Sequence, residues 1–477
     1  MRPRSTLQGL ALALGGGIFA AMLFVGPPEG LTSAAWTTAA LGILMIVWWI
    51  SEAVPIPVTS LLPLIILPLS GVLPMGVASA PYMSPIVVLL MAGFIIAKGI
   101  ERWNLHTRIA LGVIAKIGTS PFALLAGFMI AAALLSMWIS NTATALMMTP
   151  IALSVSGVLC ETEQSERFQT TLLLSIAYAC SIGGLATPVG SPTNLIVIGY
   201  LEELGRTVSF AEWMQLGVPV VLVLIPVAWL ILVHYSRNSV SPDAQGIADL
   251  VHRRQKQLGS ISNPEIRTAA LFAFVALAWI FRGQLQKLPL LVNLNDQIIA
   301  VLGVVAFFIV PSGSVKERGT ALLDWKTAES IPWGVVLLFG GGLSLATAIT
   351  QSGLAAFMAT QMSGLLGIPI LLLILLLVIL VLMLTEFTSN VATVSALMPV
   401  IGALAIAGEM DPLVLAVPVG LAASCAFMLP MATGPNAVAY ATDRVTVRKM
   451  ASIGIRINVV AALVITFVSY FLTPHAL

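Results

Sequence analysis

Two Ser-Asn pairs, Ser140-Asn141 and Ser389-Asn390, stand 249 positions apart in otherwise apolar stretches, and a proline follows each asparagine nine residues later. Serine hydroxyls and asparagine amides donate hydrogen bonds to carboxylate oxygens, and their own oxygens can face a cation. A bilayer core cannot satisfy a loose amide or a broken helix end, so such groups persist there only where they line a protein cavity. The duplication therefore predicts a transport site.

A break rich in Gly, Pro, Thr and Asn follows each pair, at 186–194 and at 431–437. The carbonyls of such turns offer hard, neutral oxygen ligands to a small cation. Glu386 is the one acid beside a break, which favours an anionic solute together with monovalent cations held by neutral oxygens. A single Ser-Asn pair could merely join neighbouring helices. Two pairs at matched positions, each with a break after it, favour a site.

The composition indicates the class of protein that must position these groups. The chain has 477 residues, of which 58% are hydrophobic and 9% charged, and its mean hydropathy is +1.02. Its apolar runs repeatedly reach the length of about 20 residues that spans a bilayer. We therefore expect an all-α polytopic membrane protein. The net charge of +2 gives no indication of nucleic-acid binding, and the three cysteines show no metal-ligand spacing.

The apolar runs and their breaks predict about 11 transmembrane helices and two re-entrant helical hairpins. The hairpins are expected at 121–158 and 355–407. The chain divides into a first half at 1–235, a polar cytoplasmic linker at 236–264 and a second half at 265–477. The predicted spans are 8–26, 33–50, 57–73, 82–100, the broken helix 167–200, 212–235, 265–281, 296–311, 331–351, the broken helix 411–440 and the last helix 449–473.

The distribution of basic residues orients this topology. Lys and Arg gather in the cytoplasmic loops of membrane proteins, and an N-terminus in the cytoplasm places 19 of the 22 Lys and Arg residues on the cytoplasmic side. Only Arg206, Arg282 and Lys287 fall outside. We therefore predict a multi-pass protein of the cytoplasmic membrane with its N-terminus in the cytoplasm.

The duplication extends beyond the Ser-Asn pairs. At the same offset of 249, residues 89, 93, 97, 100 and 105 are matched by identical residue types at 338, 342, 346, 349 and 354. The predicted topology makes the two halves enter the membrane from opposite faces, which is an inverted repeat. Inverted repeats with discontinuous helices place their site near the membrane midplane, where half-helix N-termini attract anions and unwound carbonyls coordinate a cation.

At these residues the chain resembles the divalent anion/sodium symporter family of di- and tricarboxylate carriers, over nearly its whole length. The resemblance implies sodium-coupled symport of C4-dicarboxylates of the succinate, malate and fumarate class, with Na⁺ as the coupling ion and no organic cofactor. It also implies a homodimer in the lipid bilayer that works by an elevator mechanism.

The resemblance implies two groups of site residues. The substrate would be held by Ser140, Asn141, Thr142, Ser389, Asn390, Val391, Thr433 and Gly434. Sodium would be held by Ser136, Ser140, Asn141 and Gly190 at a first site, and by Thr385, Thr388, Asn390 and Ala432 at a second. Two positions depart from the family pattern. Val391 stands where a Thr is frequent, and Gly434 gives a turn expected to be looser than a Pro-Pro version.

Three alternatives are separable. An intramembrane enzyme would need a paired nucleophile and base, two acids or a metal motif within the spans, and Ser140 has no His or Lys at helical spacing. A channel would not saturate at modest substrate concentration. Within the carrier class, the protein could be a sodium-independent dicarboxylate exchanger, or a citrate or sulfate carrier of the same family.

Overall fold

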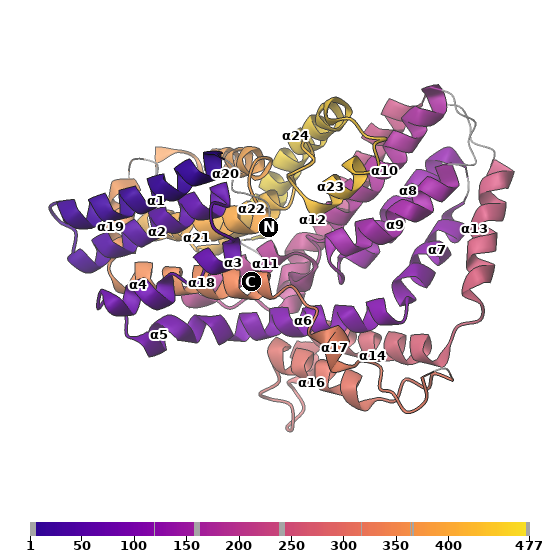
Figure 1. Cartoon of the computed structure of the whole chain (residues 1–477), viewed down its shortest axis with the longest axis horizontal. Helices are drawn as coiled ribbons and strands as arrows, with labels where there is room; N and C mark the ends of the chain where they lie inside the picture. The colour runs from indigo at the N-terminus through magenta and orange to yellow at the C-terminus, as the bar shows by residue number, and fades with distance from the viewer. Residues whose placement is uncertain are drawn as a thin grey trace.

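The computed structural model describes residues 6–118, 120–156, 163–237, 244–315, 317–362, 364 and 367–473. Within these residues the regular structure is helical, apart from one isolated antiparallel bridge between Pro311 and Ala321 (Figure 1). Seven of the described segments are long and apolar enough to cross a membrane, namely Thr6–Val25, Ser33–Ser51, Met75–Arg102, Phe210–Ser236, Trp333–Gln351, Asn390–Ala407 and Val447–Leu472. They agree with the prediction of a polytopic membrane protein.

The first half contains the first hairpin and the first broken helix. In chain order its elements are α1 (Thr6–Val25), α2 (Ser33–Ser51), α3 (Ile56–Thr59), α4 (Pro63–Leu69), α5 (Met75–Ser79), η1 (Ala80–Met83), α6 (Pro85–Arg102), α7 (Leu105–Ile117), α8 (Pro121–Ser136), α9 (Asn141–Ser156), α10 (Glu163–Gly183), η2 (Pro188–Gly190), α11 (Pro192–Glu203) and α12 (Phe210–Ser236).

The second half repeats part of this order. Its elements are α13 (Ala244–Leu258), α14 (Asn263–Ile280), α15 (Arg282–Leu285), α16 (Asp296–Ile309), α17 (Trp325–Ala328), α18 (Trp333–Gln351), α19 (Leu354–Met362), α20 (Ile370–Thr385), α21 (Asn390–Ala407), α22 (Leu413–Ala423), α23 (Gly434–Tyr440) and α24 (Val447–Leu472). The bounds of α8, shifted by 249, coincide with those of α20, and the first residues of α9 and α21 correspond at the same offset. The duplicated sequence therefore folds into duplicated helices.

Local sequence explains where several of these helices begin. α8 starts with Pro121 after Ser120, whose side chain accepts a hydrogen bond from the backbone N–H of Ala123. α12 starts with a reciprocal capping box between Ser209 and Glu212. Such caps satisfy N–H groups that have no partner within the helix.

The predicted span 57–73 is not one continuous helix, which corrects the sequence-based expectation. It is divided into α3 and α4, and Pro63 is the first residue of α4. Proline has no N–H to continue the hydrogen-bond ladder of the preceding turn, so the helix stops at Thr59 and begins again.

The second hairpin also differs from the range 355–407 predicted for it. α19 is a separate helix, and the hairpin consists of α20 and α21, with Pro369 immediately before α20. The first hairpin consists of α8 and α9; residues 157 and 158 of its predicted range lie outside the described part of the chain. The polar segment 236–264 contains helix α13.

The broken helices lie at the centre of the fold. In α11 every residue from Thr193 to Leu201 is buried, and in α22 every residue from Leu415 to Ala423 is buried. α1 buries only Gly15. A helix that is apolar and buried on all sides belongs to the interior. Figure 1 shows α11 and α22 in the middle, with the first hairpin to one side and the second to the other.

Candidate functional site

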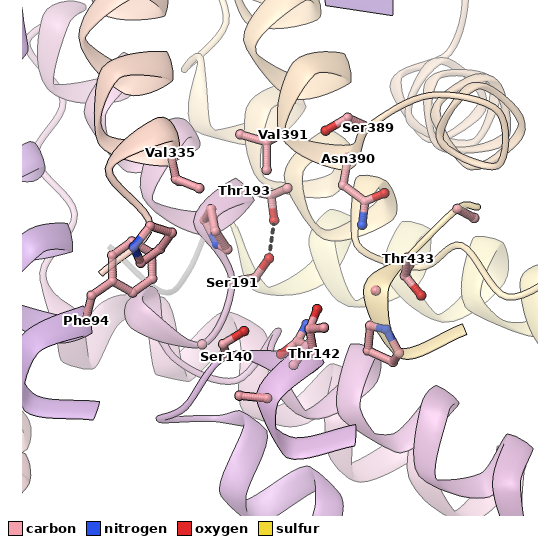
Figure 2. Close-up of a pocket in the computed structure, with 18 of the residues that line it drawn as sticks. Phe94, Ser140, Thr142, Ser191, Thr193, Val335, Ser389, Asn390, Val391 and Thr433 are labelled. Atoms are coloured by element: carbon pink, nitrogen blue, oxygen red, sulfur yellow. Dashed lines mark hydrogen bonds between the residues drawn. The ribbon is translucent and has the colours of Figure 1, made fainter. Parts of the chain in front are cut away.

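Both Ser-Asn segments line one cavity of about 710 Å³. Figure 2 shows Ser140 and Thr142 on one side of this space and Ser389 and Asn390 on the other. The structure therefore brings together two segments that are 249 positions apart in the sequence. Eleven of the predicted site residues line the cavity: Ser140, Asn141, Thr142, Gly190, Thr388, Ser389, Asn390, Val391, Ala432, Thr433 and Gly434.

The other two predicted site residues, Ser136 and Thr385, lie behind the cavity wall. Each is the last residue of the first helix of its hairpin and is fully buried. The Thr385 hydroxyl lies 2.7 Å from Asn390 Oδ1 and 2.8 Å from the carbonyl of Ala423. In this hairpin the hydroxyl thus joins the start of α21 to the end of α22.

The first hairpin repeats this arrangement. The Ser136 hydroxyl lies 2.7 Å from the carbonyl of Cys180, near the end of α10, and also contacts the Asn141 amide. The same amide group of Asn141 faces the carbonyls of Gly190 at 3.2 Å and Cys180 at 3.3 Å. The hairpin tip and the break after α10 therefore meet at a cluster of oxygen atoms.

In each break, the side chain of a second asparagine donates hydrogen bonds to backbone carbonyls. Asn194 Nδ2 donates to the carbonyls of Gly184 and Thr187, both at 2.8 Å. Asn436 Nδ2 donates to the carbonyls of Ala426 and Leu429, both at 3.0 Å. These bonds hold carbonyls of the breaks, where the hydrogen-bond ladder of each helix is interrupted. The two breaks are thus built in the same way.

Glu386 distinguishes the second break from the first. Its side chain is buried, and its carboxylate accepts hydrogen bonds from the backbone N–H groups of Phe427, Met428 and Leu429 at 2.9–3.0 Å. Asn458 Nδ2 of α24 donates to the same carboxylate at 2.7 Å. The matched position of the first hairpin, 249 residues earlier, is Met137. The acid noted beside the break therefore ties the hairpin tip to the unwound backbone.

Glycines allow close approach of backbone and side chains at the cavity. A Cβ atom on Gly434 would collide with the hydroxyl of Thr142, and a Cβ on Gly190 would lie 2.6 Å from the carbonyl oxygen of Gly184. The reason for Gly434 is thus close approach between α23 and α9, rather than the looser turn expected from the sequence.

The opposite wall of the cavity is largely apolar. It contains Phe94 and Ala97 of α6, Ile50 of α2 and Val335 of α18. Three charged side chains also line the cavity. Lys98 and Glu101 form an ion pair of 2.7 Å, and Glu52 is exposed. The hydroxyl and amide groups that line the cavity are therefore found mainly on the hairpins and breaks.

The contacts of Thr388 and Val391 could not be predicted from the sequence. The hydroxyl of Thr388 donates to the carbonyl of Leu384 at 2.8 Å and lies 2.5 Å from the hydroxyl of Thr393, so the hairpin itself engages it. Val391 lines the cavity and also packs against buried apolar residues.

Two residues that line the cavity at the first break, Ser191 and Thr193, were not among the predicted site residues. Their position within the polar stretch 186–194 was the signal in the sequence that could have identified them.

Comparison with known proteins finds relatives that align with nearly the whole chain. Residues 9–473 match the family described as the sodium:sulfate symporter transmembrane region. The chain is 39% identical to the sodium-dependent dicarboxylate transporter SdcS of Staphylococcus saprophyticus, over 98% of this chain and 92% of that protein. It is 38% identical to SdcS of Staphylococcus aureus strain MRSA252, over 100% of this chain and 93% of that protein.

Two solved structures have a similar fold. The YdaH transporter of Alcanivorax borkumensis aligns with a TM-score of 0.59 and 13% identity, covering 83% of this chain and 86% of that one. The antimetabolite efflux pump MtrF of Neisseria gonorrhoeae aligns with a TM-score of 0.60 and 12% identity, covering 94% and 96%. At these identities the likeness concerns the fold alone.

Proposed function

The chain belongs to the sodium:sulfate symporter family, and from this premise we propose that it carries C4-dicarboxylates such as succinate, malate and fumarate across a membrane together with sodium. The SdcS proteins, named as sodium-dependent dicarboxylate transporters, support this substrate class because they align with nearly the whole chain. Membership of this family makes the chain a multi-span transporter and not an enzyme.

The observation that carries the proposal is a surplus of acceptor oxygens over protons behind the cavity. A hydroxyl has one proton, yet the Thr385 hydroxyl lies within hydrogen-bond distance of two acceptors, Asn390 Oδ1 and the carbonyl of Ala423. Ser136 contacts the Asn141 amide and the carbonyl of Cys180 in the same way. In the second cluster one oxygen therefore lacks a donor, and a cation would satisfy it. In the first cluster the carbonyl of Cys180 also accepts from the backbone N–H of Gly184 at 3.1 Å.

The environment of the Asn141 amide is compatible with a cation at the first site. One of its two polar atoms faces Gly190 and Cys180 carbonyls and the Ser136 hydroxyl. Without a cation, the nitrogen should occupy this position and donate to them. With a cation among these atoms, the oxygen should occupy it instead. The donor set thus fits sodium at the first site, and the matched set of Thr385, Asn390 and Ala423 fits it at the second.

The substrate side fits a short dianion. Ser140, Thr142, Ser389 and Thr433 place hydroxyl groups at the cavity, and α9 and α21 begin there at Asn141 and Asn390. The first N–H groups of a helix have no intrahelical partner, and the N-terminal end of its dipole attracts anions. Because the two groups of donors lie across the cavity from each other, we assign one carboxylate to each hairpin.

The remaining site assignments follow the same pairing. We assign Ser136, Ser140, Asn141 and Gly190 to the first sodium site, and Thr385, Thr388, Asn390 and Ala432 to the second. The hydroxyl of Thr388 is engaged within its hairpin, so we assign its carbonyl to this role. Val391 and Gly434 would shape the second carboxylate pocket without donating a side-chain hydrogen bond.

We further propose that the two halves, 1–235 and 265–477, form an inverted repeat with the N-terminus in the cytoplasm. The matching bounds of α8 and α20 and the predicted cytoplasmic position of 19 of the 22 basic residues support this arrangement. The cavity reaches Lys98 on the predicted cytoplasmic side, so the conformation is inward-facing in this scheme. A homodimer with moving hairpins, the elevator arrangement, is the corresponding assembly.

Uptake of labelled succinate into proteoliposomes tests the function. An inward sodium gradient should drive accumulation, and replacing sodium with potassium or choline should abolish it. Uptake that is unchanged without sodium but depends on dicarboxylate inside the vesicles would identify an exchanger. Competition by citrate or sulfate, but not by malate or fumarate, would move the substrate assignment to those anions.

A further inference from the structure

Three buried hydroxyl groups form a closed cluster between the two breaks. Ser191 Oγ lies 2.8 Å from Thr193 Oγ1 and 3.0 Å from Ser424 Oγ, and Thr193 Oγ1 lies 2.6 Å from Ser424 Oγ. The three side chains are 4%, 0% and 2% exposed. Figure 2 shows Ser191 and Thr193 pointing toward each other between the two hairpin tips. We call these residues the hydroxyl triangle.

The triangle contains as many protons as contacts. Each hydroxyl can donate once and accept, so the three O–H bonds can follow one another around the ring in either direction. While the ring is closed, no hydroxyl has a proton left for a neighbouring acceptor; when Thr193 donates to Asn194 Oδ1 instead, only Ser191 and Ser424 donate within the ring. A small change at one corner can therefore reverse the donors at the other two.

One corner of the triangle is connected to the first break. Thr193 Oγ1 lies 3.4 Å from Asn194 Oδ1, and Asn194 Nδ2 donates to the carbonyl of Gly184. A Cβ atom on Gly184 would lie 2.7 Å from Asn141 Oδ1, so this peptide packs directly against the Asn141 amide. In addition, Ser191 is the residue after Gly190, whose carbonyl faces the same amide.

Another corner is connected to the second break. Ser424 follows Ala423, the last residue of α22, and the carbonyl of Ala423 accepts the hydrogen bond from Thr385. Thr385 in turn contacts Asn390 Oδ1 at 2.7 Å. Hydrogen bonds of 2.6–3.4 Å, single peptide units and the packing of Gly184 against Asn141 thus link Asn141 of one hairpin to Asn390 of the other.

Helices α11 and α22, which flank the hydroxyl triangle, are closely packed against each other. A Cβ atom on Gly420 of α22 would collide with Val197 of α11, which means that the two helices are in direct contact beside the triangle. Closely packed interiors transmit displacements rather than absorb them. A cation that draws the Gly190 or Ala423 carbonyl toward itself would therefore move a corner of the triangle.

We propose that the hydroxyl triangle couples the two cation sites, so that sodium in one raises the affinity of the other. The inference rests on the proposed function, because it requires both sites. Ser191, Thr193 and Ser424 are then positioning residues that act through the two breaks. Coupling of this kind between sites commonly changes affinity about 5-fold to 150-fold, and we expect the low end for one hydroxyl cluster.

The test compares Thr193→Val, which removes one corner at nearly constant shape, with Thr193→Ser, which keeps the hydroxyl. Ser424→Ala removes a second corner and serves if Thr193→Val does not fold. The matched control is Ser344→Ala, which removes a buried hydroxyl of α18 bonded to the carbonyl of Ala78. Melting temperature of the purified protein and succinate uptake in proteoliposomes are measured from low to high sodium, with choline keeping the ionic strength constant.

We expect wild type to respond to sodium with a Hill coefficient above 1. In Thr193→Val the sodium concentration for half-maximal response should rise about fivefold and the Hill coefficient should fall toward 1. Thr193→Ser and Ser344→Ala should retain the wild-type sodium response. A role limited to packing would lower the melting temperature equally in sodium and in choline, and would leave the sodium response unchanged.

The outcomes separate the two proposals. An unchanged Hill coefficient and half-maximal concentration in a folded Thr193→Val or Ser424→Ala protein overturns the coupling and leaves symport intact. A wild-type Hill coefficient of 1 does the same. A wild-type protein whose melting temperature and uptake both ignore sodium overturns the proposed function, and the coupling with it.

Discussion

Replacing Glu386 with glutamine should weaken the second break, although the two side chains have nearly the same shape. One carboxylate oxygen accepts from Phe427 N, Met428 N and the Asn458 amide, and the other accepts from Met428 N and Leu429 N. All four of these partner groups are donors. A glutamine must turn its NH₂ group toward one of these donors, whichever way its amide is oriented.

The geometry sets the magnitude. Hydrogen bonds to a charged group contribute about 1.5–3 kcal/mol, and a buried donor left without an acceptor costs about 1–3 kcal/mol. Glu386→Gln loses one such bond at least, so we expect a loss of about 3 kcal/mol in stability. Glu386→Met, which copies Met137 of the first hairpin, leaves all four donors without an acceptor and should be worse.

The sodium response should change with stability, because Glu386 follows Thr385 directly in the chain. A loss of 1.4 kcal/mol in the binding of one cation corresponds to about a tenfold weaker affinity. Melting temperature and the sodium dependence of succinate uptake would be measured for both variants and for Glu29→Gln, an exposed control. The expected order of stability is wild type, then Gln, then Met. If both variants melt and respond to sodium as wild type does, the carboxylate does not hold the break and the reasoning is wrong.

Three further predictions have defined outcomes. Asn141→Ala and Asn390→Ala should each lower succinate uptake at least about tenfold, or roughly 1.4 kcal/mol, with folding largely intact by size-exclusion chromatography; near-normal uptake in both would make the Ser-Asn pairs packing features. Val391→Thr should tighten dicarboxylate binding by about 0.5–1.5 kcal/mol if the new hydroxyl reaches substrate, whereas unchanged affinity with a lower melting temperature would remove position 391 from the site. Burial raises the pKa of Glu202 from 4.5 to about 6, so the folded protein holds this proton more tightly and loses stability as pH rises from about 4.5 through about 6; Glu202→Gln should remove that part of the pH dependence of melting, and a variant whose curve parallels wild type would contradict it.

Much of the fold was predictable because its signals are local. Runs of apolar residues indicate the helices. The signals that start a helix, such as Ser120-Pro121 and the Ser209/Glu212 capping box, each lie within a few consecutive residues. The interruption of the span 57–73 was also encoded locally, by Pro63, but hydropathy averaged over about 20 residues does not resolve it. The separate helix α19 was missed for the same reason.

The candidate site was predictable in its residue types and unpredictable in its contacts. Ser140-Asn141 and Ser389-Asn390 stand out because neutral polar pairs are costly inside a membrane, and the duplication singles them out without any structure. The burial of Ser136 and Thr385 behind the cavity, and the engagement of the Thr388 hydroxyl within its own hairpin, depend on how each tip folds back on its break.

The sequence by itself determined the class of the protein, the two polar hairpins and the residue types of an anion and cation site, since composition, periodicity and duplication are properties of the linear chain. Only the tertiary structure decided that Ser191 and Thr193 meet Ser424, that Gly434 lies against Thr142 and that Glu386 caps the unwound backbone at 427–429. Several of these contacts join segments more than 200 residues apart. A hydrogen bond requires its two atoms within about 3 Å, and the packing of α22 against α11 brings such distant residues that close.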